Sequence, residues 1–427
     1  MTSSVVHRNM EKVARAGCVW RRLAAGDGVR VCAASPLTPA TGGGGDPLGH
    51  IPPHSRMKSN YSSVPQQKPD WNRAVSDAEK IVGYPTSYLT LRSLLSDEMS
   101  NIAVHMRKLV GSSHPLLKTA KRLIYNGRNN MQTRGLIVLL ISKAAGHLNP
   151  EELDQDQPAG VSLSQRSLAE ITEMIHTAHL IHKGVVNLSP TVFDGTTLQD
   201  MEFGNKIAIL SGDYLLANAC TGLAALRNTK VVELISTAIS DFMEAEFIGD
   251  RDNQGNPIPN ETITMQDWNE KNFLAAGSLM AKSCQATLLL AGHSEAMQKK
   301  GFEFGKEIAL AWQVYSDLQP FTDLYRHPPG TAIDLTSAPV ILHLLHDNSL
   351  LDYVTAAGNS MENCDFKKIH QLIMSGNAVE EAKQLCQSHA QAALNVVQDT
   401  FEPSDACTAF GEHHKCSQDL LAQTFLF

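Results

Sequence analysis

The chain is poor in aromatic residues and has no long apolar run, and both shortages restrict what it can be. Aromatic side chains make up 6% of the 427 residues, while Ala, Leu and Ile are plentiful, which favours helices over a β-sandwich. No apolar run approaches the roughly 18 residues that a membrane-spanning helix needs. The strongest such run, Leu136 to Ser142, is short and is typical of a buried helix segment.

Paired cysteines and a basic excess are also lacking. None of the eight cysteines has Cys-x-x-Cys spacing, so we expect reduced thiols rather than a disulfide scaffold or a zinc ribbon. The net charge of -8, with no basic stripe, argues against nucleic acid as the main partner. We also find no nucleotide-binding glycine loop and no catalytic-serine motif.

The N-terminal region differs from the rest of the chain. Residues 1–58 contain Arg8, Lys12, Arg15, Arg21, Arg22, Arg30, Arg56 and Lys58, against Glu11, Asp27 and Asp46. Arg-rich, acid-poor character predicts a mitochondrial import signal, the alternative being an unstructured tail with accidental charge. A segment rich in Gly, Pro and Ser follows. We therefore assign 1–68 to a transit peptide and disordered linker, and 69–427 to one domain.

The domain has the apolar period of helices. Apolar residues recur at steps of three and four, as in the stripe Leu168, Ile171, Ile175, Ala178, Ile181 and Val185. Two polar segments, 147–165 and 249–263, have loop composition. No strand-turn-strand pattern is present. The sequence thus predicts an all-α fold, a single bundle of about a dozen helices.

Three histidines on one predicted helix raise the question of a metal site. His176, His179 and His182 lie three residues apart, and Glu173 forms a Glu-x-x-His pair with His176. A carboxylate-bridged metal pair needs a second Glu-x-x-His, and the chain contains none. We therefore interpret these residues as packed or partly exposed histidines and predict no metal site here.

Four blocks carry a family resemblance, in the order Glu173–His182, Phe203–Ala219, Leu279–Ala286 and Phe304–Val314. The chain resembles the trans-polyprenyl diphosphate synthases over most of residues 70–405. The resemblance implies an isoprenoid-synthase-type bundle in which two facing helices each carry an Asp-Asp-x-x-Asp motif. In that family, magnesium ions bridge these carboxylates to the allylic diphosphate and stabilise it as it departs.

Both motif positions have lost their acids in this chain. The first falls on Lys183, Gly184 and Asn187, which contain no carboxylate and place a cation where magnesium would bind. The second falls on Ser316, Asp317 and Pro320, of which only Asp317 is acidic, and we expect Pro320 to end or kink the helix. The resemblance therefore implies no catalytic residue, no metal ligand and no cofactor bound by this chain.

Substrate contacts are reduced in the same way. The family's basic grip on isopentenyl diphosphate keeps only Arg134, and its later Lys-Thr pair and loop Lys fall on Ala275, Ala276 and Thr331. Ala178 occupies the position that helps to set product length in the family. Its small side chain is either part of a tail tunnel or a helix-packing residue.

Within the family, the pattern resembles the non-catalytic second subunits of animal decaprenyl or solanesyl diphosphate synthases. Those subunits pair with a catalytic homologue, which holds the Mg²⁺, in a mitochondrial enzyme that makes the ubiquinone side chain. The resemblance implies a heterodimer or heterotetramer in the matrix. The block Phe203–Ala219 supplies the candidate interface residues Gly212, Asp213, Leu216 and Ala217, whose alternative role is intrachain core.

Two other functions stay open at this point. The first alternative to the subunit role is a self-sufficient prenyltransferase that holds diphosphate through Lys183 and Arg134. The second is an isoprenoid-binding module without a reaction of its own.

Overall fold

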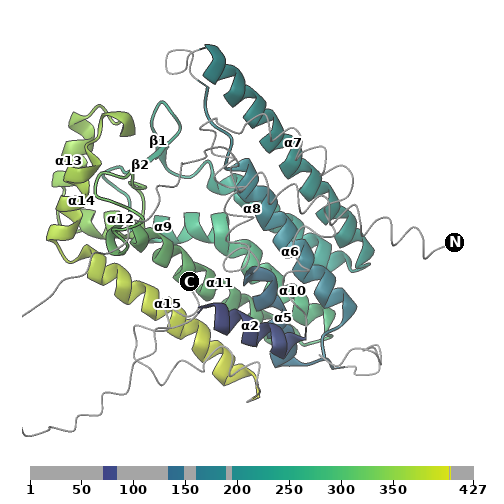
Figure 1. Ribbon diagram of the computed structural model, residues 1–427. Helices are drawn as coiled ribbons and strands as arrows, with labels where there is room; N and C mark the ends of the chain where they lie inside the picture. Colours follow the sequence, from purple (N-terminus) through teal and green to yellow (C-terminus); the bar gives the residue numbers. More distant parts are fainter. Residues whose placement is uncertain (1–70, 84–132, 149–159, 189–194, 403, 405–427) are drawn as a thin grey trace, which may run out of the picture.

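The protein folds as a bundle of helices, shown in Figure 1. The computed structural model describes residues 71–83, 133–148, 160–188, 195–402 and 404. Its elements are α2 (Trp71–Val82), α5 (Thr133–Ala145), α6 (Leu163–His182), α7 (Gly195–Ala225), α8 (Thr229–Ala245), β1 (Asp250–Arg251), β2 (Pro257–Ile258), α9 (Met265–Asn272), the π-helix η4 (Phe273–Gly277), α10 (Ser278–Leu290), α11 (Glu295–Thr322), α12 (Ala338–Leu344), α13 (Ser349–Ala356), the 3₁₀-helix η5 (Met361–Asn363), α14 (Phe366–Ser375) and α15 (Ala378–Thr400). The predicted all-α bundle is confirmed, whereas the predicted leader and linker, 1–68, lie outside the described residues.

Helix α6 shows how the sequence fixes one element of the bundle. It begins with a capping box, in which the Ser162 hydroxyl accepts the Gln165 N–H and the Gln165 side chain accepts the Ser162 N–H. The predicted stripe from Leu168 to Ile181 is buried, while its last member, Val185, is exposed. The helical period therefore identified the buried face correctly.

The tightest packing joins α10 to α11, and we call this contact the α10–α11 seam. Gly305 lies so close to α10 that a Cβ atom there would be 2.7 Å from the Ala281 Cα and from the Met280 carbonyl oxygen. A Cβ at Gly301 would similarly lie 2.9 Å from the Cys284 carbonyl oxygen. The two helices can approach this closely because both residues lack a side chain.

Hydroxyl pairs connect α10 to the other central helices. Ser142 of α5 and Thr287 of α10 share a hydrogen bond of 2.6 Å between their buried oxygens. The Thr172 hydroxyl of α6 donates to the Ser283 oxygen of α10 over 2.9 Å. These four buried hydroxyls are thus paired, so they do not cost their full desolvation penalty.

One π-helical turn, η4, joins α9 to α10. In this turn the hydrogen bonds span five residues, and it includes Ala275 and Ala276, the positions of the family's Lys-Thr pair. Trp268 and Lys271 of α9 lie before the turn and line a cavity of about 170 Å³ with residues of α12 and the loop before α9.

The sequence-based expectations failed at two places in the fold. A short antiparallel hairpin, β1–β2, lies within the polar segment 249–263, with Asp250 opposite Ile258. Its strands have two residues each, too few to produce a visible alternation. Helix α11 also continues past Pro320 to Thr322, so this proline does not end the helix, while the kink stays a prediction. Proline removes only one backbone donor, and here it does so in the last turn.

Two helical stretches, Leu198–Ala225 and Met265–Leu290, are long and apolar enough on average to cross a membrane. In the most apolar 18-residue segment of each stretch, 39% and 56% of the residues are buried within the structure. Core helices of globular proteins meet the same criterion, so length and composition do not distinguish the two cases for these helices.

Candidate functional site

The first motif position lies just beyond the end of α6. Lys183 is the C-cap of the helix and its side chain is exposed, whereas Gly184 is buried and Asn187 is exposed. Backbone contacts hold the loop in place: the Asn205 side chain accepts the Val186 N–H at 2.9 Å and donates to the Val186 carbonyl oxygen at 2.8 Å. The side chains of this segment therefore do not share a helix face.

The second motif position lies on α11, and its residue Asp317 accepts hydrogen bonds from three other residues. Its Oδ2 accepts the Trp268 indole N–H and the Ala338 backbone N–H, each at 2.9 Å, and its Oδ1 accepts the Gln313 amide at 2.8 Å. The Ala338 bond satisfies a free donor at the start of α12. The surviving motif carboxyl thus fastens α9 and α12 to α11.

Burial dominates the ionisation of this carboxyl group. Burial, together with the smaller effect of the negative charge of Asp334, raises the pKa of Asp317 to about 7. The three donors act in the opposite direction because they stabilise the ionised form. Beside it, the Ser316 hydroxyl donates to the Trp312 carbonyl oxygen at 3.0 Å, and Pro320 carries no polar side-chain atom.

These two segments offer few of the oxygen ligands that Mg²⁺ prefers. Mg²⁺ takes carboxylate oxygens in an octahedral arrangement, and the first segment supplies none. Both oxygens of Asp317 already accept hydrogen bonds from the protein. Across the described parts of the chain, no group of three or more His, Cys, Asp or Glu side chains is placed to hold a metal ion.

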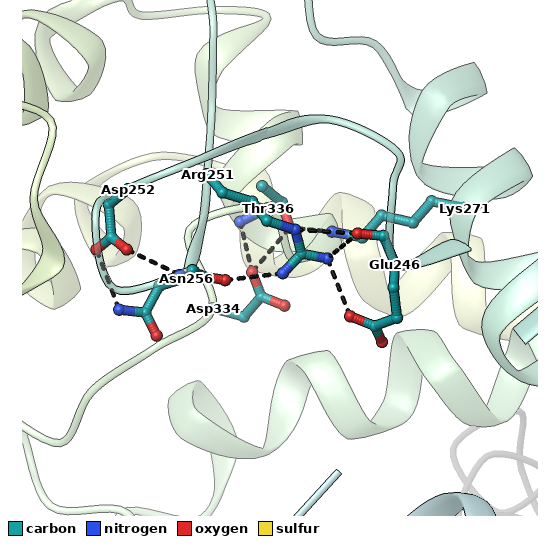
Figure 2. A network of polar contacts seen from close by, with 8 residues as sticks. Glu246, Arg251, Asp252, Asn256, Lys271, Asp334 and Thr336 are labelled. Carbon is teal, nitrogen blue, oxygen red and sulfur yellow. Dashed lines mark hydrogen bonds and ion pairs between the residues drawn. The ribbon is translucent and has the colours of Figure 1, made fainter. Parts of the chain in front are cut away.

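Polar side chains of mixed charge occupy the same end of the bundle (Figure 2). The Lys271 ammonium donates to the Thr336 hydroxyl at 3.1 Å, and Asp334 accepts both the hydroxyl and the N–H of Thr336 at 2.8 Å. Burial lowers the pKa of Lys271, Asp334 opposes this, and Lys183 lowers it further. The Lys183 charge acts on Lys271, and the Asp334 charge acts on both Lys271 and Asp317. We therefore group 183–187, Asp317 and the residues of Figure 2 as one region, which we call the mouth.

Arg134 lies deeper in the bundle, at the start of α5, near Glu173 of α6. Burial lowers the pKa of Arg134, and the charge of Glu173 partly restores it. Burial also raises the pKa of Glu173 to about 7, opposed by the Gly135 N–H, which donates to Oε1 at 2.8 Å, and by the Arg134 charge. The other carboxyl oxygen, Oε2, has no hydrogen-bond partner in the described structure.

The three histidines of α6 occupy different environments. Burial lowers the pKa of His176 well below its usual value, with a further contribution from Arg134. His179 stacks on Phe242 of α8 with ring centroids 4.3 Å apart, and burial lowers its pKa to about 3. The His182 ring faces α7, with Nε2 3.3 Å from the Ile209 carbonyl oxygen. His176 and His179 are therefore neutral at neutral pH.

Ala178 is fully buried against α7. Its neighbours in the core are Ile181, Ile207, Ala208 and Leu215. These contacts are those of the helix-packing role. A tail-tunnel role for Ala178 stays a prediction.

The candidate interface residues of α7 divide between two faces of the helix. Gly212 is buried against its own chain, because a Cβ atom there would lie 2.1 Å from the Nε2 of His182. Leu216 is partly buried and packs into two core clusters. Asp213 and Ala217 are exposed, and Asp213 lies 3.3 Å from the His182 ring. Figure 1 shows α7 at the outer edge of the bundle, beside α6.

Sequence reasoning missed several residues of the mouth. Lys271 and Arg251 were not singled out, because each lies in a polar stretch without a motif. The partner of Lys271 is 65 residues away, so no local spacing links the two. The composition of 249–263, rich in Asn, Asp and Gly, was the one available signal for the hairpin turn.

This fold and these motif positions define the class of the protein. A model of the polyprenyl synthetase family matches residues 116–332, about half of the chain. The chain belongs to the polyprenyl synthetase family.

Named relatives narrow the comparison. The chain is 46% identical over 344 residues to the all trans-polyprenyl-diphosphate synthase PDSS2 of Rattus norvegicus, a match that covers 79% of this chain and 85% of that protein. The Homo sapiens protein of the same name is 46% identical over 343 residues, with the same coverage. The probable mitochondrial hexaprenyl pyrophosphate synthase of Neurospora crassa is 31% identical, covering 82% of this chain and 88% of that protein.

Solved structures show the same fold. A medium/long-chain length prenyl pyrophosphate synthase of Arabidopsis aligns with a TM-score of 0.51 at 24% identity, covering 78% of this chain and 98% of that chain. A decaprenyl diphosphate synthase of Rhodobacter capsulatus aligns with a TM-score of 0.55 at 16% identity, covering 83% and 98%. The predicted isoprenoid-synthase-type bundle is thereby confirmed.

Proposed function

We propose that this chain is the non-catalytic subunit of a heteromeric all-trans long-chain polyprenyl diphosphate synthase that makes the ubiquinone side chain. Its partner is a catalytic homologue that carries both Asp-rich motifs and holds the Mg²⁺. One observation carries the proposal: the sole carboxyl group left at the motif positions, Asp317, is used to fasten three elements of the fold.

The charge at the mouth supports the same conclusion. Metal-assisted departure of diphosphate needs several converging carboxylates, which neutralise and position the magnesium ions. Here Lys183 and Lys271 place cations beside the motif positions, and their charges repel Mg²⁺. The names of the relatives, one of them mitochondrial, and the basic N-terminal region support a location in the mitochondrial matrix.

The outer face of α7 is the surface we assign to the partner. Ile209 and Leu210 are 46% and 53% exposed, and Ala217 and Cys220 lie on the same face about two and three turns later. Isolated exposed apolar residues are ordinary, but a row of them along a long helix is typical of an interface. A stable heteromer should bury on the order of 2,000 Å² there.

Prenyl transfer from labelled isopentenyl diphosphate with Mg²⁺ tests the activity. The purified chain is assayed alone, the catalytic homologue alone, and then the co-purified pair. We expect long-chain product from the pair and none from this chain by itself. Product from this chain alone would instead establish a self-sufficient prenyltransferase, and binding of an isoprenoid without turnover or partner would establish a carrier.

Cys220 provides a separate test of the surface. It is exposed, whereas Cys284 and Cys386 are buried, so a maleimide should label it readily in the free chain. We expect the catalytic partner to slow this labelling at least tenfold. Leu210→Arg should weaken the pair, while Met374→Arg, at an apolar residue of α14 that is 45% exposed, is the matched control and should not. Equal effects of the two variants would remove α7 from the interface.

A further inference from the structure

We propose that the hairpin β1–β2 is a strap that holds the mouth closed without any ligand, fastened to the first motif position by Asn187 and to η5 by Asp252. The contacts on which this rests are present whether or not the chain turns over substrate, so the inference is independent of the proposed function.

The first fastening is a side-chain amide on the turn of the hairpin. The Asn187 Nδ2 donates to the Gln254 carbonyl oxygen, across 67 residues of sequence. The neighbouring Gly255 has a φ of +84°, and a Cβ atom there would lie 3.1 Å from the same Nδ2. Both the turn conformation and the close approach of Asn187 therefore favour glycine at this position.

The second fastening is the carboxylate of Asp252. Its Oδ1 accepts the N–H groups of Gln254 and Asn256 at 2.9 and 2.8 Å, and its Oδ2 accepts the Asn256 amide at 3.0 Å and the Met361 N–H at 3.1 Å. Burial raises the pKa of Asp252, but the hydrogen bonds, led by Asn256, outweigh it and lower the pKa. The carboxylate thus closes the turn and reaches η5 at once.

Arg251 stiffens the base of the strap, as Figure 2 shows. Its guanidinium donates to the Gly255 carbonyl oxygen at 2.8 Å and to the Glu246 carbonyl oxygen at 2.6 Å, and it lies 3.0 Å from the Glu246 carboxylate. The hairpin is therefore tied to the end of α8 as well as to its two outer contacts. Two segments distant in sequence, at Asn187 and Met361, thus contact the stretch 249–263, which is also bonded to the end of the preceding helix α8.

The chemistry at position 187 explains why the strap excludes a metal ligand. The acceptor on the hairpin is a carbonyl oxygen, which requires a donor, and the asparagine amide supplies one. A carboxylate in the same place can only accept, so two oxygens would face each other and repel. An acid at position 187 and a closed strap are thus incompatible in this chain.

Hydrogen exchange of the full-length chain tests the strap. The reporters are the amides of Gln254, Gly255 and Asn256 in the turn, and that of Met361 at the far end. We expect Asn187→Ala and Asn187→Asp to accelerate exchange at all four amides by about tenfold, with the larger effect in Asn187→Asp. Amides of α11 should exchange as in the wild type, which shows that the variants fold.

The control separates the contact from the added charge. Asn395 of α15 accepts a hydrogen bond from Gln391 through its Oδ1, an oxygen that aspartate retains. Asn395→Asp should therefore leave the four reporters unchanged. Wild-type exchange at Gln254 to Asn256 in Asn187→Ala would overturn the proposal, and faster exchange there with no change at Met361 would reduce it to a local turn contact.

Discussion

The α10–α11 seam and the mouth both include residues of helix α11, but they differ in what the residues do. Those of the seam pack two helices together, and those of the mouth occupy the positions of a metal-binding motif. At the seam, Gly301 and Gly305 bring two backbones together as closely as sterics allow. At the mouth, two turns or more further along, the positions of a catalytic motif are held by Ser316, Asp317 and Pro320. The packing of the family fold is present, whereas of these motif positions only Asp317 is a carboxylate.

This difference indicates what the chain must still do. Shape complementarity inside the bundle is costly to lose, since even one added methyl group in a full core strains it. The ligands of a metal ion contribute nothing to folding once the ion is absent. Their places are free for hydrogen bonds within the chain, as Asn187 and Asp317 show. The four predictions below test the seam, the buried carboxyl group of Glu173 in the bundle interior, and the mouth.

The largest effect is expected at the seam. In Gly305→Ala the new Cβ meets backbone atoms of Ala281 and Met280 at 2.7 Å, and neither can turn away. We expect the free energy of unfolding to fall by about 3 kcal/mol, measured by urea denaturation. Gly212→Ala is the comparison, because its obstacle is the His182 side chain, which can move aside. A loss in Gly305→Ala no larger than that of Gly212→Ala would show that the seam is not tightly packed.

The second prediction concerns pH and Glu173. Its folded pKa of about 7 is above the usual value for a carboxyl group, so the folded state holds the proton more tightly than the unfolded state. The stability from this group is present below pH 4 and is lost as the pH rises through 7. Glu173→Gln should remove on the order of 2 kcal/mol of the difference in unfolding free energy between pH 5 and pH 8.

Glu233→Gln, at an exposed residue of α8, serves as the control for that measurement. It should leave the pH dependence of unfolding as it is in the wild type. If Glu173→Gln and Glu233→Gln give the same profile, the carboxyl group of Glu173 is not buried in the way the structure shows.

The third prediction separates the shape of Asp317 from its charge. Asp317→Ala leaves the Trp268 and Ala338 donors without their acceptor, and should cost about 2 kcal/mol of unfolding free energy. Asp317→Asn keeps an oxygen in place and should cost less than half as much at pH 8, where the wild type must ionise a buried group. Thermal or urea unfolding of both variants measures the two losses of unfolding free energy. Equal losses in Asp317→Ala and Asp317→Asn would mean that the negative charge of Asp317 is required.

The smallest effect is expected from restoring the acids. A variant with Asp at positions 183, 184, 187, 316 and 320 should still give no product without a partner, because only Arg134 remains of the isopentenyl diphosphate grip. The structure adds a second reason. Helix α6 ends before the first motif position, so the side chains of 183–187 do not share a helix face and do not converge on one metal ion. Labelled product from this variant alone would show that loss of the acids was the whole defect.

Much of the fold followed from the sequence because helices impose a period on it. The buried stripe of α6, from Leu168 to Ile181, was predictable from apolar spacing. The assignment of the family's motif positions to 183–187 and 316–320 stays a prediction, although the structure does place Asp317 on a helix, α11. Where the pattern was short, as in β1–β2, no period was available to detect.

The candidate site was harder to predict because its contacts use backbone atoms. Asn187 binds a carbonyl oxygen and Asp317 binds an N–H group, and every residue of a chain offers both. The residue types at positions 254 and 338 therefore do not indicate that their backbone atoms bind Asn187 and Asp317. The loss of carboxylates at the motif positions is visible in the sequence. The hydrogen bonds that Asn187 and Asp317 make are visible only in the structure.

The π-helical turn η4 sets the rotational phase between α9 and α10. An α-helix advances by about 100° for each residue, and a turn with one residue more shifts everything before it by about that angle. This phase lets Trp268 face Asp317 while Met280 and Ala281 face α11. Loss of one residue between 273 and 277 would leave a continuous α-helix and an intact seam, but would turn the indole away from the mouth.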